Sequence, residues 1–577
     1  MYAAATKCKI LKFAELPIMM SGEKPIVTAQ INGADARFVL DTGAFYSMIS
    51  SASAQQFNLR QGPAPFGLRV GGIGGSTVPS LANVKVFTFA GVPIRDIDFL
   101  VGGSEVGQGA AGLLGQNFLE KWDEEYDLAN GVVRFFKPED CQHVGLAYWA
   151  TAEHPASTMD IGVVTFMKPH ATGAAYINGA KIKVMFDSGA ASSMLSLRAA
   201  AGAGVKPGLP GVDEAGYSRG IGRSMVKTYI AHFASFKIGD NEEIKNARLR
   251  IADTELGEAD MLLGADFFLS HHLYISNYQH RVYFTYNGGP VFNLSRQAAG
   301  KDPADAAPTA EPPGKTDVTD AAALARLGAA SAGRHDYVHA VEEFTRAAEL
   351  EPASAEYVYQ RGMAYRNDKQ PTPAAADFDQ ALQLNPDHLD ARVARAQLRM
   401  ANRELEGGIA DLDAADRLAP KQADVRFTLA ELYEKAERLP SALTQWDLWI
   451  SNHPDDSKMA GALNNRCWTK TMLGQDLPHA LSDCNAAYRR SDKSSPLRTR
   501  ILENRGLVRL RSGDYDQAIA DYDEALKLEP KSAGAMYGRG IAKLRKKKTA
   551  EGESDIAVAV KTWPQVADEF KRRGIVP

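Results

Sequence analysis

The first half of the chain alternates short apolar runs with turn residues, which is the pattern of a β-rich fold. Residues 26–31 read as a strand, Asn32 and Gly33 as a two-residue turn, and residues 36–40 as the returning strand. The returning strand ends at Asp41, where a hydroxyl residue and a glycine force a tight turn. A carboxylate at such a junction of strand and loop is held rigidly and can still reach a cleft.

From residue 320 the apolar pattern changes to a period of 34 residues. Small residues, one large residue and a closing proline recur at fixed spacings, first as Leu324, Leu327, Gly328, Ala340, Phe344, Ala347 and Pro352. These spacings resemble those of the tetratricopeptide repeat, or TPR. We expect seven helical hairpins within residues 320–577, stacked into a solenoid and capped by the segment from about Pro564. The resemblance implies a protein partner on the concave face of the solenoid.

The turn at Asp41 is written twice in the chain. Residues 38–44 read Phe-Val-Leu-Asp-Thr-Gly-Ala, and residues 184–190 read Val-Met-Phe-Asp-Ser-Gly-Ala. The Ile-Asn-Gly-Ala before each aspartate and the Ser-Met after it repeat at the same offset of 146 residues. We infer an internal duplication, in which each of two related lobes presents one aspartate, Asp41 or Asp187.

A glycine-rich stretch follows in each lobe. The first is centred on Gly72, Ile73 and Gly74, and the second on Gly220, Ile221 and Gly222. Glycine at this density permits unusual backbone torsions and close approach to a ligand, so each stretch is a candidate flap for substrate binding. A phosphate-binding loop is disfavoured, because there is no GxxxxGK[ST] and the glycines do not open a helix.

Late in each lobe comes a further matched element, an apolar strand that ends at a glycine and leads into a short helix. It spans residues 112–119 in the first lobe and 260–269 in the second. Each lobe then closes with a strand, at residues 132–136 and 280–284.

Together these motifs resemble the retropepsin-like aspartic proteases, over roughly residues 20–290. The resemblance implies a bilobal all-β protease fold with the catalytic pair Asp41 and Asp187. Two carboxylates a few ångström apart share a proton, so one can draw a proton from a water while the other donates to the scissile carbonyl. The residues expected to support the pair are Thr42, Gly43, Ser188 and Gly189. One departure is Asn117, where such lobes often carry an aspartate, as at Asp266 in the second lobe.

Composition excludes some classes of function. The net charge of -4 and the pI near 6.3 show no basic footprint for nucleic acid. No apolar run approaches the ~18 residues of a membrane span. The adjacent pair His271 and His272, expected on a short helix, has no acidic partner motif, so we expect neither a metal site nor a cofactor.

The four cysteines fall into two local pairs. Cys8 and Cys141 bracket the first lobe, whereas Cys467 and Cys484 are expected to face each other within one helical hairpin. Two disulfides would suit an oxidising compartment, so a periplasmic or otherwise exported protein is one reading. Four reduced, buried thiols in a cytoplasmic protein are the other.

The sequence therefore predicts a multidomain chain with an all-β bilobal protease part and an all-α solenoid. The expected boundaries are 1–145 for lobe 1, 146–297 for lobe 2, 298–319 for a linker and 320–577 for the solenoid. The expected function is an aspartic endopeptidase that acts on a protein or peptide substrate. The alternative is a non-catalytic peptide-binding scaffold with a protease-like cleft.

Overall fold

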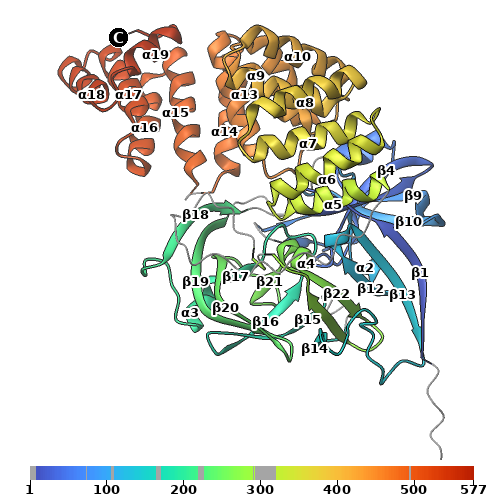
Figure 1. Ribbon diagram of the computed structural model, residues 1–577. Helices are drawn as coiled ribbons and strands as arrows, with labels where there is room; N and C mark the ends of the chain where they lie inside the picture. The colour runs from blue at the N-terminus through green and yellow to red at the C-terminus, as the bar shows by residue number, and fades with distance from the viewer. Residues whose placement is uncertain are drawn as a thin grey trace, which may run out of the picture. The chain divides into compact units, whose positions relative to one another are not determined.

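The computed structural model describes residues 8–72, 75–104, 109–163, 170–218, 226–289, 291–292, 320–492 and 495–576 (Figure 1). The chain divides into two compact units. One contains residues 1–222 and 226–398, and the other contains residues 223–225 and 399–577. The predicted linker, 298–319, lies outside the described residues.

The first lobe is built on an eight-stranded sheet that closes on itself through an additional pairing between β3 and β9. In spatial order its strands are β2 (Met19–Ser21), β3 (Lys24–Ile31), β4 (Ala34–Leu40), β11 (Gly112–Leu114), β5 (Met48–Ile49), β10 (Val92–Val101), β9 (Ser80–Phe89) and β6 (Gln61–Pro63). The β3–β4 hairpin turns at Asn32 and Gly33, which both have positive φ, as the Asn-Gly sequence predicts.

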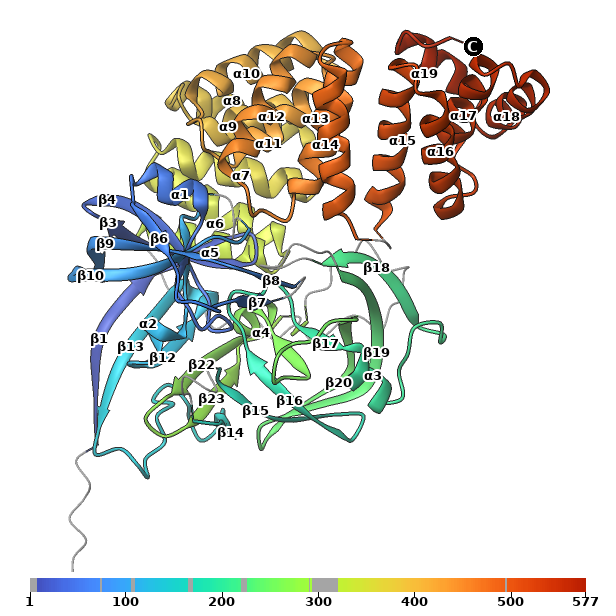
Figure 2. The ribbon, with the colours of Figure 1, turned by 180° about the vertical axis from the view of Figure 1, so that it is seen from behind.

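The second lobe repeats this plan in a seven-stranded sheet, seen from behind in Figure 2. Its strands are β15 (Thr172–Ile177), β16 (Ala180–Phe186), β21 (Met261–Leu263), β17 (Met194–Ser196), β20 (Glu242–Ala252), β19 (Val226–Ile238) and β18 (Val212–Ser218). In both lobes the strand that leads to the aspartate pairs in parallel with the late apolar strand, as β4 with β11 and as β16 with β21. The duplication in sequence is therefore a duplication in topology.

A six-stranded sheet joins the two lobes. Its order is β1 (Lys9–Pro17), β13 (Val132–Glu139), β12 (Asp123–Asp127), β22 (His271–Ser276), β23 (Arg281–Tyr286) and β14 (Ser157–Asp160), so that each lobe supplies three strands. The seam is the antiparallel pair β12 and β22, where Glu124 lies opposite Ile275. All five residues of β12 are buried.

The acidic residues of β12 have partners across this seam. Asp123 accepts hydrogen bonds from the Ser276 hydroxyl (2.6 Å) and from the backbone N–H of Tyr278 (2.9 Å). The carboxylate of Glu125 lies 2.9 Å from Nε2 of His272. The expectation of a short helix for the His271–His272 pair was wrong: both residues lie in β22, and His271 contacts Glu242 through Nε2 at 2.7 Å. Both histidines thus have carboxylate partners within the fold.

Short helices and one small hairpin complete the β part. The helices are α1 (Ser51–Gln56), α2 (Gln116–Leu119), η1 (Leu128–Asn130), α3 (Leu197–Gly202) and α4 (Ala265–Ser270), and the hairpin pairs β7 (Val70–Gly72) with β8 (Gly75–Thr77). This hairpin stands at the first predicted flap. Gly72 lies in β7, whereas Ile73, Gly74, Gly220, Ile221 and Gly222 lie outside the described residues.

The repeat helices begin with α5 (Ala321–Gly333), α6 (Tyr337–Leu350), α7 (Ala355–Asn367), α8 (Pro371–Leu384) and α9 (Leu389–Ala401). Leu324 and Ala325 of α5 belong to the same hydrophobic core as Leu16 and Ile18 of the β part. At the end of α5, a Cβ added to Gly333 would lie 3.0 Å from the carbonyl oxygen of Gly22. The first repeat is thus packed against the β part.

The second unit holds the later repeats, α10 (Leu405–Leu418), α11 (Val425–Lys435), α12 (Leu439–Asn452), α13 (Met459–Leu473), α14 (Leu477–Arg490), α15 (Pro496–Arg511), α16 (Tyr515–Leu528), α17 (Ala533–Arg545), α18 (Thr549–Thr562) and α19 (Val566–Arg572). In each hairpin a small residue on the first helix lies under a large one on the second. A Cβ on Gly506, for example, would meet the Tyr522 ring at 2.9 Å. Just before this position, Arg505 pairs with Asp521, and Arg466 and Arg539 make the same kind of bridge in their hairpins.

Both predicted cysteine pairs are disulfides. Cys8 joins Cys141, and Cys467 of α13 joins Cys484 of α14. In the second pair, sulfur atoms occupy the small and large positions of the repeat, so that a covalent bond replaces the usual packing contact. The predicted fold class, a bilobal all-β part followed by an all-α repeat part, is confirmed. None of the described helices is long and apolar enough to cross a membrane.

Candidate active site

The two duplicated turns meet at the centre of the β part. Asp41 follows β4, and its backbone N–H donates to Leu114 O of β11 at 3.0 Å. Asp187 follows β16, and its N–H donates to Leu263 O of β21 at 2.9 Å. The backbone of each aspartate is therefore anchored to the neighbouring parallel strand.

The hydroxyl residues of the turns bond across the boundary between the lobes. Thr42 Oγ1 donates to Phe186 O at 2.9 Å and accepts from the Ser188 N–H at 2.9 Å. In return, Ser188 Oγ donates to Leu40 O at 2.7 Å and accepts from the Thr42 N–H at 3.1 Å. Both side chains are fully buried. The two turns are thus locked together by four reciprocal hydrogen bonds.

The glycines of the turns allow the carboxyl groups to approach. A Cβ added to Gly43 would lie 2.2 Å from Cγ of Asp187, and one added to Gly189 would lie 2.2 Å from Cγ of Asp41. The same glycines donate backbone N–H bonds of 3.1 Å to the aspartate of their own turn. Any side chain here would displace the opposite carboxylate, so glycine is required at both positions.

The two carboxyl groups are within hydrogen-bonding reach of one another and titrate as a pair. Burial, opposed by the nearby positive charge of Lys24, raises the pKa of Asp41. Burial and the charge of Asp41 raise the pKa of Asp187 to about 8. The pair consequently retains one proton across mildly acidic to neutral pH, which is the state needed for combined acid and base chemistry. Both aspartates remain partly exposed.

Each turn rests on a matched support from the late strand and helix of its lobe. In the first lobe, Asn117 Oδ1 accepts from the N–H (2.8 Å) and the hydroxyl (2.9 Å) of Ser47. In the second, the Asp266 carboxylate accepts from the N–H (2.9 Å) and the hydroxyl (2.6 Å) of Ser193. The departure at Asn117 leaves this support intact, because an amide oxygen accepts the same two bonds.

Two basic residues beside the aspartate pair lie outside the duplicated turn motif and were not predicted from it. Lys24 lies close enough to Asp41 to oppose the rise in its pKa, and His170 bonds to the backbone of Gly43. Burial lowers the pKa of His170. The two residues are related by the same offset of 146 as the aspartates. A search for further charged residues at that offset could have found them.

Comparison with known proteins agrees with these features. Residues 27–121 and 174–270 match the family described as "gag-polyprotein putative aspartyl protease". Residues 359–423 and 504–567 match the tetratricopeptide repeat family. No curated protein matches the chain.

Similar solved structures are repeat proteins. One is the APC/C hetero-tetramer Cut9-Hcn1, with 16% identity and a TM-score of 0.31. The match covers 45% of this chain and 49% of the Cut9-Hcn1 chain, so this chain spans about half the length of that relative. Another is a tetratricopeptide repeat protein from Parabacteroides merdae, with 17% identity and a TM-score of 0.31, covering 44% of this chain and 98% of that one. Yeast Tom70 matches at 19% identity, covering 44% and 52% with a TM-score of 0.26.

Proposed function

Because the chain carries two retropepsin-like aspartyl protease segments and tetratricopeptide repeats, we propose that it is an aspartic endopeptidase whose catalytic pair is Asp41 and Asp187. The observation that supports this most directly is the contact between the two carboxyl groups with a pKa raised in each.

In the proposed reaction, the singly protonated pair binds a water molecule between its carboxyl groups. The ionised carboxylate takes a proton from this water, and the oxygen of the water forms a bond to the scissile carbonyl carbon. The protonated carboxyl donates its proton to the carbonyl oxygen, which gives a neutral tetrahedral diol. The carboxyl that took the water proton then donates it to the amide nitrogen, the other carboxylate takes a proton from one hydroxyl of the diol, and the C–N bond breaks to give an acid and an amine. The roles belong to the pair, because the shared proton exchanges between Asp41 and Asp187.

The fold would hold this geometry without reorganisation. The four bonds between Thr42 and Ser188 fix the distance between the turns, and the glycine N–H groups orient the carboxylates. Preorganised donors of this kind lower the barrier because they cost nothing at the moment of reaction. We propose that the glycine-rich segments around Ile73 and Ile221 cover a bound substrate.

The repeats are the proposed means of selecting a protein substrate or partner. Stacked helical hairpins present an extended concave surface, which such repeats use to bind other chains. We propose the domain boundaries 1–145, 146–297, 298–319 and 320–577 for the two lobes, the linker and the solenoid. The two disulfides support an exported, for example periplasmic, location, because such bonds persist in oxidising compartments.

The test is hydrolysis of an unfolded protein by wild type and by matched Asp→Asn variants between pH 4 and 8. Asp41→Asn and Asp187→Asn should each lower kcat/KM by about 100-fold or more, because each removes one partner in proton transfer. Asp35→Asn is the control, since Asp35 is an exposed residue of β4, the strand that leads to Asp41. A wild type that binds peptides without cutting them would instead identify a non-catalytic peptide-binding scaffold.

A further inference from the structure

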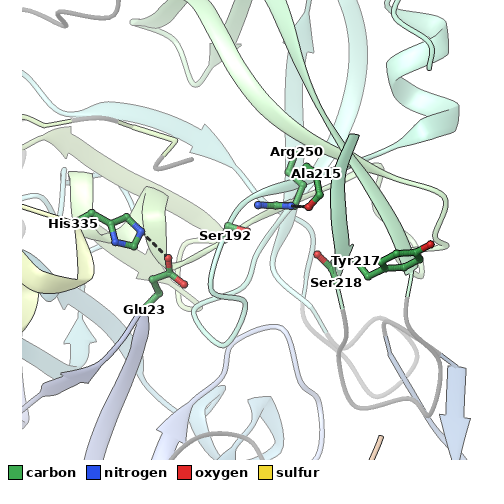
Figure 3. Close-up of a pocket in the computed structure, with 7 residues that line it drawn as sticks. All are labelled: Glu23, Ser192, Ala215, Tyr217, Ser218, Arg250 and His335. Carbon is green, nitrogen blue, oxygen red and sulfur yellow. Dashed lines mark hydrogen bonds and ion pairs between the residues drawn. The ribbon is translucent and has the colours of Figure 1, made fainter. Parts of the chain in front are cut away.

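A polar pocket of about 380 Å³ lies on the second lobe, next to the turn that carries Asp187 (Figure 3). Ser192 belongs to that turn, and Ser218 is the last residue of β18. Arg250 of β20 completes this side of the pocket. The volume suits one side chain of a bound peptide together with water. Its position makes it a candidate subsite of the proposed protease.

Arg250 is held in place by one end of its guanidinium. Nη1 donates to Thr228 Oγ1 at 3.0 Å and to Ala215 O at 3.4 Å. Both acceptors are neutral, and within the described part of the chain no carboxylate forms an ion pair with Arg250. Burial lowers the pKa of this guanidinium, yet an arginine stays protonated in proteins. Its remaining donors point from β20 toward Ser192 (Figure 3).

The acidic groups nearest to Arg250 are already engaged. Glu23, on the opposite wall, contacts Nε2 of His335 at 3.1 Å. His335 comes from the connection between α5 and α6, so the first repeat contributes to the pocket. Asp266 accepts the hydrogen bonds of Ser193 described above. Among the described residues that line the pocket, Arg250 is therefore the cation without a carboxylate partner.

The equivalent place in the first lobe is filled by apolar side chains. Arg250 lies opposite Met194 in the pairing of β20 with β17, and Leu100 lies opposite Met48 in the pairing of β10 with β5. Leu100 is buried in an apolar cluster, against which Tyr46 packs. Tyr46 is the counterpart of Ser192 at the offset of 146. The duplication has thus placed apolar side chains at this position in one lobe and a cation in the other.

We propose that this pocket binds a carboxylate of the peptide substrate through Arg250, which makes the protease selective for an acidic residue on one side of the scissile bond. The role of this pocket as a substrate subsite rests on the proposed protease function. A carboxylate can receive two parallel bonds from a guanidinium, whereas the amide of glutamine accepts fewer and carries no charge. The same chemistry would also fit the free carboxylate at the end of a peptide.

The experiment compares peptides in which Glu or Gln is placed at each position in turn, with a free or an amidated C-terminus. kcat/KM is measured with wild type, and Kd is measured by fluorescence anisotropy with the full-length Asp41→Asn variant. We expect a preference for Glu at one position of about 10- to 100-fold, as for a hydrogen bond to a charged group. A preference that depends only on the free C-terminus would place the chain end in the pocket, and would still require Arg250.

Two variants copy the first lobe into the second, Arg250→Leu and Ser192→Tyr. Each should abolish the preference for Glu over Gln in kcat/KM and in Kd, while the thermal unfolding of the β part stays near wild type. Arg198→Leu is the control, because Arg198 is 84% exposed and pairs with Asp260 on the surface. The proposal is overturned if wild type shows no preference for a carboxylate, or if Arg250→Leu keeps it. Discrimination in Kd without any cleavage by wild type would refute the proposed function and leave this inference standing.

Discussion

We expect the reciprocal bonds made by Thr42 and Ser188 to contribute measurably to the stability of the β part. Thr42→Val removes only the hydroxyl and keeps the shape of the side chain. It abolishes the bonds to Phe186 O and to the Ser188 N–H, both 2.9 Å long, and leaves these two backbone groups buried without a partner. Each unsatisfied group costs about 1–3 kcal/mol, so we expect the two to lower the free energy of unfolding by about 2–6 kcal/mol.

The assay is equilibrium urea unfolding, with the unfolding of each segment detected by hydrogen exchange and mass spectrometry. Peptides that span residues 38–50 and 184–196 report on the β part separately from the solenoid. Both peptides should lose protection at a lower urea concentration in the variant, because the bonds join the two lobes.

Thr77 provides the matched control. It is 2% exposed, and its Oγ1 has no hydrogen-bond partner among the described residues. Thr77→Val makes the same chemical change at a buried site without breaking a bond, so it should be neutral or slightly stabilising. If Thr42→Val and Thr77→Val had the same effect, the reciprocal bonds would contribute nothing and the reasoning would fail.

Two further predictions concern buried carboxyl groups. Burial raises the pKa of Glu124 to about 7, so the stability that this group contributes is full below its ordinary pKa of 4.5 and is lost as the pH rises toward 7. Glu124→Gln should therefore match wild type at pH 4.5 and exceed it by about 3 kcal/mol at pH 8 in urea unfolding; parallel pH curves would contradict this. Asp266→Asn should keep the bonds to Ser193, as Asn117 does in the other lobe, whereas Asp266→Ala should lose about 2 kcal/mol by leaving them unmade. If the two variants had equal stability in the same assay, the bonds from Ser193 to residue 266 would not support the turn.

Local signals were enough to predict the duplicated turns and the repeats. The turn at Asp41 depends on neighbours in the sequence, and its second copy at Asp187 made a chance match implausible. The disulfide between Cys467 and Cys484 was predictable for a related reason, since the register of one hairpin places both residues face to face.

Contacts between distant segments had no such signal. The pairing of β12 with β22 joins residues about 150 positions apart, and nothing in either strand specifies the other. The docking of α5 on the β part depends on Leu324 and Ala325, which serve equally well as the core positions of a free repeat. The contact of Glu23 with His335 spans 312 residues and follows from that docking. Arg250 escaped notice because its counterpart, Leu100, is chemically unlike it.

The sheet shared by the lobes has a consequence for synthesis on the ribosome. β12 is made long before β22, so its edge stays unpaired while the second lobe is translated. Unpaired edges invite association with other chains, and charged residues on an edge prevent it. β12 carries four acidic residues, Asp123, Glu124, Glu125 and Asp127, that are buried only when β22 arrives. These acids, of which Glu124 is unfavourable when ionised in the finished sheet, would thus protect the nascent chain from aggregation.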